Sequence, residues 1–206
     1  GGIVTAGFWA LGPIVAQAQG LTGEQIGLFM AATILGGATF QLPIGRLSDK
    51  FDRRLVLILI AVLGIAVSAL AWVIDGADYR FMLVLMFLFG GVTFPIYSLC
   101  LAHANDNTAL MLMEVASVIL LMHSAGAVVG PLIVAALLDY TGDGLFVVAG
   151  VTLMLFAIWT TWRVKTHPVD RAYFAPFVDV PRTTREAAGF YQDKRGQGTF
   201  PQDGAG

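Results

Sequence analysis

The chain has 206 residues, of which 57% are hydrophobic and 13% are charged, whereas soluble domains carry about 25% charged residues. With a mean hydropathy of +0.76, a soluble fold would expose apolar side chains to water, so the composition indicates a lipid bilayer as the surrounding medium. The net charge of −2 excludes a nucleic-acid-binding protein, because nucleic acid requires clustered basic residues.

Six stretches of the chain lack Asp, Glu, Lys and Arg, and each has about the 20 residues that cross a bilayer as a helix. The sequence therefore predicts an all-α, polytopic membrane domain over residues 1–165. Short connections with turn residues, among them Thr22 as a candidate N-cap with Gln25 three residues later, make neighbouring helices antiparallel. The six transmembrane helices are expected near residues 1–18, 24–45, 55–74, 81–102, 115–138 and 144–162.

Basic residues predict which side of the membrane each connection faces. Eleven of the twelve lie between the second and third spans or after the sixth, and Arg80 is the other one. Because Lys and Arg beside a span are retained in the cytoplasm, we expect both ends of this chain to be cytoplasmic. The opening residues lack the basic region of a signal peptide, and they belong either to a longer chain or to a trimmed terminus.

Residues 166–206 are predicted to form a cytoplasmic tail, because prolines, glycines and charged residues replace the apolar runs there. Such a segment is either a disordered extension or a segment that becomes ordered when it docks on a partner. Aromatic side chains would carry the docking, since they bury the most area per side chain. The candidate docking residues are Tyr173, Phe174, Phe177, Phe190 and Tyr191.

Prolines mark an internal repeat in the membrane domain. Pro13, Pro43, Pro95 and Pro131 fall in the first, second, fourth and fifth spans, while the third and sixth have none. Three helices repeated as three more, with inverted topology, form half of a secondary transporter. The pattern therefore predicts two inverted three-helix repeats.

Polar and small residues follow the same four spans, which we expect to face a common cavity or a partner, with the third and sixth spans the most exposed to lipid. Each polar residue either lines a polar path or packs between helices through a small-residue face. Glycines at the Gly126-x-x-x-Gly130 spacing, with Pro131 beside them, favour helix packing. The candidate cavity-lining residues are Thr33, Gln41, Thr93, Tyr97, His123 and Ser124.

Between the second and third spans, residues 45–54 read Gly-Arg-Leu-Ser-Asp-Lys-Phe-Asp-Arg-Arg. This segment resembles the cytoplasmic signature of the major facilitator superfamily, G-x-L-[AS]-D-[RK]-x-G-R-[RK], and departs from it at Asp52, where the family has Gly. We expect Asp49 to latch the segment to the cytoplasmic end of a neighbouring helix, with the fifth span favoured. The candidate latch residues are Gly45, Arg46, Asp49, Lys50, Arg53 and Arg54.

Residues 94–106 and the Gly130-Pro131 pair also look like the fourth and fifth helices of a C-terminal half in bacterial carriers of this superfamily. The resemblance implies the C-terminal six-helix half of a transporter in the bacterial inner membrane, which moves a small solute by alternating access against an N-terminal six-helix half. The alternative is a transport-inactive, six-helix structural or assembly subunit whose partners are other membrane subunits.

The chain lacks the motifs of nucleotide-binding, metalloprotease and hydrolase sites. The sequence therefore predicts a protein that is not an enzyme, has no catalytic residues, and needs neither a cofactor nor a metal. No Asp, Glu, Lys or Arg lies within a span, so His123 is the candidate titratable group deep in the membrane. It is either a proton-coupling residue or a neutral histidine bonded across a helix contact.

Overall fold

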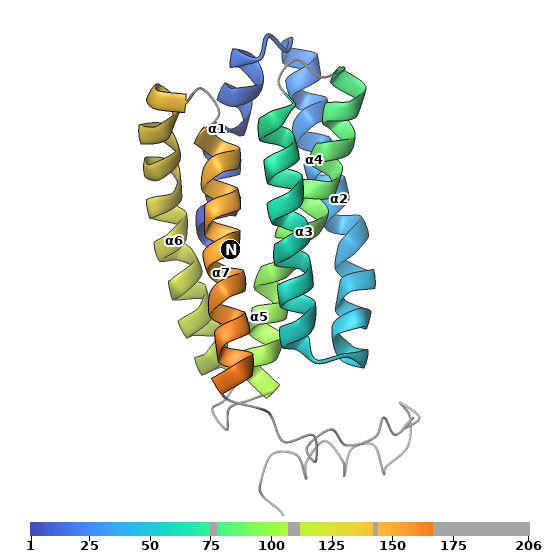
Figure 1. The fold of residues 1–206 in the computed structure, drawn as a ribbon, viewed down its shortest axis with the longest axis vertical. Helices are drawn as coiled ribbons and strands as arrows, with labels where there is room; N and C mark the ends of the chain where they lie inside the picture. Colours follow the sequence, from blue (N-terminus) through green and yellow to red (C-terminus); the bar gives the residue numbers. More distant parts are fainter. Residues whose placement is uncertain (75–77, 107–111, 142–143, 167–206) are drawn as a thin grey trace, which may run out of the picture. The chain divides into compact units, whose positions relative to one another are not determined.

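The computed structural model describes residues 1–74, 78–106, 112–141 and 144–166 of the chain, and these residues belong to one compact unit, Gly1–His167. Within the described residues the secondary structure is helical throughout (Figure 1). Because α4 and α5 follow each other as one interrupted rod, the predicted all-α fold of six helices is confirmed. The elements are α1 (Gly2–Ala18), α2 (Gly23–Lys50), α3 (Arg53–Val73), α4 (Tyr79–Thr93), α5 (Pro95–Asp106), α6 (Leu112–Thr141) and α7 (Gly144–Thr166).

Five rods in the described part are long and apolar enough to cross a membrane, whereas α1 is shorter. Its 17 residues extend for about 26 Å at 1.5 Å per residue, less than the hydrocarbon core of about 30 Å. Gly1 lies beside His123, midway along α6, because a Cβ built on Gly1 would be 3.5 Å from the Nδ1 atom of that histidine (Figure 1). Gly1 therefore lies at mid-height of α6, and the expectation that both ends of this chain are cytoplasmic stays a prediction.

The ends of α2 and α3 follow from capping residues. At the start of α2, the Gln25 N–H donates to Thr22 Oγ1 at 3.4 Å and the Thr22 N–H donates to Gln25 Oε1 at 2.9 Å, which confirms the predicted capping box. At the other end, α2 continues to Lys50, and α3 begins at Arg53. Most of the signature segment is therefore helical, and the connection that the sequence placed over 46–54 contains only residues 51–52.

Pro95 has a different effect from the other three prolines of the membrane domain. Pro13, Pro43 and Pro131 lie inside continuous helices, whereas Pro95 begins α5 directly after Phe94, the C-cap of α4. Proline has no N–H and cannot donate to the carbonyl four residues earlier. The fourth span is therefore one helical rod over Tyr79–Asp106, in which Phe94 keeps right-handed helical dihedrals and the backbone hydrogen bond that Pro95 cannot donate is missing.

The helix contacts have the symmetry of the predicted repeat. The most extensive pairs are α1 with α6, α2 with α4, and α3 with α7. If the first three rods exchange places with the last three, the α1–α6 pair becomes the α4–α2 pair, and the α3–α7 pair is related to itself. This contact pattern is the one expected for two inverted three-helix repeats.

Glycines allow the backbones to approach closely where these pairs cross. A Cβ on Gly36 of α2 would run into the carbonyl oxygen of Phe87 in α4, and a Cβ on Gly90 would run into that of Thr33. In the related pair, a Cβ on Gly130 of α6 would run into the carbonyl oxygen of Ile3 in α1. Both crossings are thus backbone-to-backbone contacts that require small residues.

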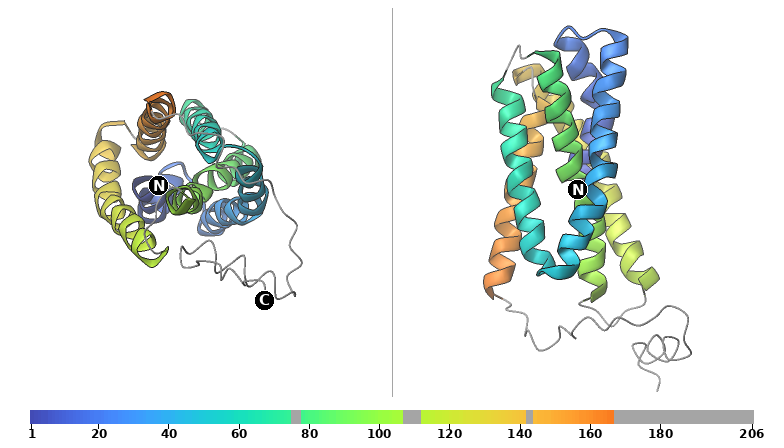
Figure 2. Two further views of the ribbon diagram at one scale, coloured as in Figure 1. Left: turned by 90° about the horizontal axis from the view of Figure 1, so that it is seen from below. Right: turned by 90° about the vertical axis from the view of Figure 1, so that its right-hand side faces the viewer.

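The helices differ in how far the rest of the bundle covers them, while the expectation that the third and sixth spans are the most exposed to lipid stays a prediction. In the most apolar stretch of each helix, 22% of residues are buried in α2 and 11% in α6, against 39% in α3 and 44% in α7. Viewed along the bundle, α6 lies at its periphery, while α5 lies near its middle (Figure 2). Because α3 and α7 pack against each other, each covers part of the other, and the least covered helices are α2 and α6.

Candidate functional site

The first candidate site is an ion-pair cluster centred on Arg53 at the α2–α3 junction. The Arg53 guanidinium lies 3.1 Å from Asp49 Oδ1 through Nη2 and 2.7 Å from Asp106 Oδ2 through Nε. Its third nitrogen, Nη1, donates to Ser48 Oγ at 3.2 Å. Since Ser48 and Asp49 belong to α2 and Asp106 ends α5, one side chain connects three helices.

Local structure places these groups. Asp49 and Arg53 are four residues apart across the junction, while Ser48 is buried and donates to the Gly45 carbonyl at 2.8 Å. Asp52 caps α3 by accepting from the Arg54 N–H at 2.9 Å, and its φ of −57° is accessible to any residue. The departure from the family signature at Asp52 therefore leaves the turn intact, and aspartate adds an N-cap that glycine lacks.

A second polar contact lies beside this cluster. Arg54 Nε donates to His103 Nε2 at 3.4 Å, and His103 precedes Asp106 by three residues on α5. Residues three apart share a helix face, so this face of α5 meets the adjacent pair Arg53 and Arg54. Acceptance at Nε2 requires the neutral imidazole.

The latch residues predicted from the sequence thus divide into two groups. Asp49, Arg53 and Arg54 take part in the cluster, whereas Arg46 and Lys50 lie exposed on α2, and a Cβ on Gly45 would meet open space. Gly45 therefore makes no close helix contact within the described residues.

Arg53 and Arg54 join the signature segment to α5, which belongs to the fourth span, whereas the described contact of Asp49 is with Arg53 of the same junction. A latch from Asp49 to the fifth span stays a prediction. Sequence reasoning missed Asp106. The signal that could have found it is its place as the first acidic residue after the fourth span.

The second candidate site is the midplane of the bundle, where four predicted cavity residues remain accessible. Thr33 and Thr93 are buried, and each donates to a carbonyl of its own helix, at Phe29 and Phe89 respectively. The structure therefore places these two threonines in helix packing. The four accessible residues are Gln41, Tyr97, His123 and Ser124.

Tyr97 and His123 meet between α5 and α6. Their ring centroids are 4.9 Å apart in an edge-on arrangement. Gly126 and Gly130 lie on α6 against Ile3 of α1. The structure thus brings the predicted packing glycines and the predicted polar pair onto one helix, in which Pro131 lies one turn beyond Gly126.

Two classes of predicted residue receive no geometry. The candidate docking residues Tyr173, Phe174, Phe177, Phe190 and Tyr191 lie outside the described residues. Among the residues that are described, no group of three His, Cys, Asp or Glu side chains could hold a metal ion.

An all-α inverted repeat, apolar rods of membrane length and a polar cluster at one helix junction together define an integral membrane protein of the transporter type. The chain belongs to the Major Facilitator Superfamily, whose sequence profile matches residues 1–193. Members of this family are in general transporters and not enzymes.

Individual relatives agree with this family. The chain is 30% identical over 175 residues to the uncharacterized MFS-type transporter YcaD of Escherichia fergusonii, a match that covers 82% of this chain and 44% of that protein. It is 28% identical over 176 residues to the uncharacterized MFS-type transporter Ent638_1421 of Enterobacter sp. (strain 638), which covers 84% of this chain and 44% of the relative. The YcaD protein of Salmonella typhi is 30% identical over 169 residues, covering 81% of this chain and 43% of the relative.

The chain spans about half the length of the curated relatives it matches. No solved structure gives a significant match to it.

Proposed function

We propose that this chain is the C-terminal six-helix half of a major facilitator transporter that moves a small solute by alternating access against an N-terminal six-helix half. The observation that carries the proposal is the low coverage of α2 and α6. Only 22% of the residues in the most apolar stretch of α2, and 11% of those in α6, are buried. The repeat relates these two helices to each other, so a second half with the same symmetry could cover both. The relatives, about twice as long as this chain, have the length for such a second half.

The polar residues on these helices support a path between the halves. Gln41 of α2 and Ser124 of α6 are exposed, and hydrocarbon would leave their polar atoms without partners. A cavity between two halves would supply water or solute to them. The choice of the C-terminal half rests on the resemblance of residues 94–106 and of the Gly130-Pro131 pair to that half.

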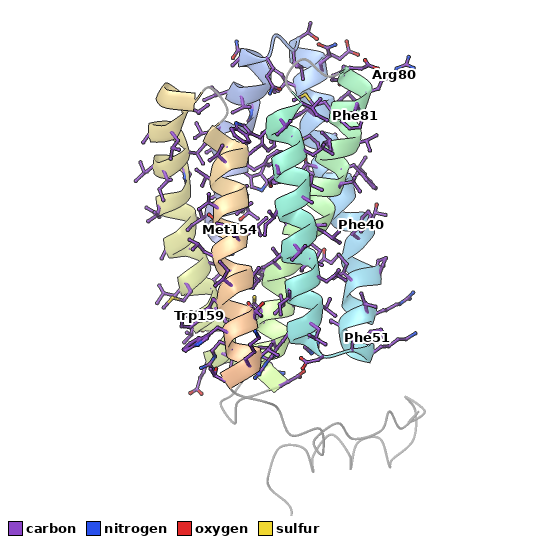
Figure 3. The ribbon with its side chains drawn as sticks, in the orientation of Figure 1. Phe40, Phe51, Arg80, Phe81, Met154 and Trp159 are labelled. Atoms are coloured by element: carbon purple, nitrogen blue, oxygen red, sulfur yellow. The ribbon has the colours of Figure 1, made fainter. Side chains whose placement is uncertain are left out.

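The sidedness of the proposed transporter follows from its basic residues. Residues 1–165 form its membrane domain, and the α2–α3 junction and the 166–206 tail face the cytoplasm of a bacterial inner membrane. Arg80 lies at the opposite end of the bundle from Phe51 of this junction (Figure 3). The Arg53 cluster would hold α2, α3 and α5 together at the cytoplasmic end in one state of the cycle and release them in the other.

Cysteine labelling tests the cavity. In a Cys100→Ser background of the complete gene product, Gln41→Cys and Ser124→Cys are treated with a membrane-impermeant maleimide. Matched controls are Val62→Cys of α3 and Leu155→Cys of α7, two exposed apolar positions in the middle of their helices. Faster labelling at Gln41 and Ser124 than at the controls supports a water-filled path.

Equal, slow labelling at all four positions, with other membrane subunits co-purifying, would favour the transport-inactive structural or assembly subunit instead. The order of the complete coding sequence decides which half the chain is. Six further spans upstream support the C-terminal half, and six downstream would contradict it.

A further inference from the structure

Two ring contacts flank Pro95 in the fourth span, one with α1 and one with α6. Trp9 of α1 lies with its ring centroid 6.2 Å from that of Phe94, at an interplanar angle of 26°. Tyr97 follows Phe94 by three residues, and its ring meets His123 of α6 at 4.9 Å. The fourth span thus presents the Phe94 ring toward α1 and the Tyr97 ring toward α6. We call these four residues the ring wall.

The ring wall lies near mid-depth of the bundle. Tyr97 is nine residues before Asp106, the end of α5, and His123 is eleven residues after Leu112, the start of α6. At 1.5 Å per residue these positions are about 14 to 17 Å from the helix ends, close to the middle of a hydrocarbon core of about 30 Å. Transporters hold their solutes near this depth of the membrane.

Three members of the ring wall carry hydrogen-bonding groups that the described residues leave without a hydrogen bond. These groups are the Trp9 indole N–H, the Tyr97 hydroxyl and the His123 imidazole. Trp9 is 48% exposed, and Tyr97 and His123 are half-buried, so a bound molecule could reach these groups; Trp and Tyr each combine an apolar ring with a polar group. The side chains therefore offer apolar ring faces together with polar groups that a bound molecule could satisfy.

Charge limits what this wall can bind. The spans contain no Asp, Glu, Lys or Arg away from their ends, so an ionic solute would find no counter-charge on this half, and an unpaired ion is strongly disfavoured at low dielectric. We infer that Trp9, Phe94, Tyr97 and His123 form a binding site for an uncharged, ring-containing solute that bears a hydrogen-bonding group. The inference rests on the proposed function and adds the class of solute to it.

Tryptophan fluorescence tests the inference in the complete gene product, with every tryptophan except Trp9 replaced by phenylalanine. The probes are para-nitrobenzyl alcohol, para-nitrobenzylamine and para-nitrophenylacetic acid, which share a quenching ring. At pH 7 the alcohol is neutral, the amine is a cation, and the acid is a carboxylate anion. The matched control keeps only Trp72, which is 51% exposed against 48% for Trp9 but lies in the last turn of α3. We expect the neutral alcohol to quench Trp9 saturably and at lower concentration than either ion, and to quench Trp72 only in proportion to its concentration.

Two variants test the assignment to the ring wall. Tyr97→Phe keeps the ring and removes the hydroxyl, so the Kd of the neutral probe should rise about three- to tenfold, as expected for one neutral hydrogen bond. His123→Leu should raise it by a similar factor, whereas Ser117→Ala, at an exposed position of α6 whose hydroxyl donates to the Met113 carbonyl of the same helix, should leave it unchanged. Circular dichroism confirms that each variant keeps its helix content.

Three outcomes would overturn the inference. Equal quenching of Trp9 and Trp72 would mean that the probe merely partitions into the membrane. Tighter binding of the amine or the carboxylate would contradict an uncharged solute, and unchanged binding in both variants would contradict the ring wall. These failures are separable from a failure of the proposed function, because the labelling of Gln41→Cys and Ser124→Cys reports the cavity independently of the probe.

Discussion

The glycine crossings and the Arg53 cluster hold helices of the bundle together in opposite ways. At Gly90 and Gly36 the backbones of α2 and α4 touch, so no added atom fits between them. At the α2–α3 junction the contacts run through a long side chain to two exposed carboxylates. Close backbone packing has one arrangement, whereas exposed ion pairs contribute about 0 to 1 kcal/mol each and can be exchanged for water. We therefore expect the crossings to contribute most of the stability, and the cluster to be the contact that a change of conformation could open.

The largest effect is expected at Gly90. Gly90→Ala would drive a Cβ into the Thr33 carbonyl, so α2 and α4 must separate, and we expect a loss of about 3 kcal/mol or more in the free energy of unfolding. Thermal unfolding in detergent, followed by size-exclusion chromatography, measures it. Gly45→Ala, where a Cβ meets open space on α2, is the control and should change stability by less than about 0.5 kcal/mol. Similar unfolding midpoints for the two variants would refute the difference in packing.

The related crossing should respond nearly as strongly. Gly130→Ala would place a Cβ against the Ile3 carbonyl, and we expect a loss of about 2 to 3 kcal/mol. Gly27→Ala, at another open position of α2, is its control in the same unfolding assay. A neutral Gly130→Ala beside a disruptive Gly90→Ala would show that the repeat is symmetric in contacts but not in energy.

A smaller effect on stability, and a larger one on conformation, is expected at Arg53. Arg53→Gln removes the link between Asp49 and Asp106, so we expect about 1 kcal/mol of destabilisation. If the cluster closes the cytoplasmic end, a cysteine at Ser124 should be labelled several times faster from that side. Arg46→Gln, an exposed residue of α2, should leave the labelling rate unchanged. Equal rates in the two variants would remove the conformational role of the cluster.

The smallest effect is expected at Asp49. The ion pair between Asp49 and Arg53 is 3.1 Å long and joins residues four positions apart across the α2–α3 junction. The pair between Arg53 and Asp106 is 2.7 Å long and joins α3 to the end of α5. Asp49→Asn should therefore accelerate labelling at Ser124 less than Asp106→Asn does, with a stability change of about 0.3 to 0.5 kcal/mol. Raising the salt concentration should shrink both effects. A larger response to Asp49→Asn would place the main latch within the junction and not between helices.

Much of this fold could be predicted from local sequence. Stretches without charge gave the helices, since charged groups are strongly disfavoured in hydrocarbon, and Thr22 with Gln25 marked the start of α2. The proline pattern indicated the repeat that the helix contacts display. These features depend on residues within one or two turns of each other, and such patterns are visible in a single chain.

Features that depend on distant parts of the chain were missed or misplaced. The partner of Arg53 is 53 residues away, so nothing local distinguishes α5 from α6. Of the four prolines in the spans, only Pro95 coincides with a helix boundary. Which proline has this effect depends on the packing around it. Thr33 and Thr93 satisfy their hydroxyls within their own helices, so the same residue type that suits a polar path also suits a dry contact. Their burial could be decided only in three dimensions.

The missing backbone hydrogen bond at Pro95 has a mechanical consequence. From Pro95 to Asp106, α5 is one uninterrupted helix of 12 residues, about 18 Å long. Its inner end carries Tyr97, and its outer end carries Asp106, the carboxylate that Arg53 holds. Because the missing hydrogen bond at Pro95 lets the rod bend there, we expect a molecule that displaced the Tyr97 ring to shift Asp106 relative to Arg53 as well. Binding of a molecule beside Tyr97 at the centre of the membrane would then be coupled, through α5, to the opening of the Arg53–Asp106 pair at the membrane surface.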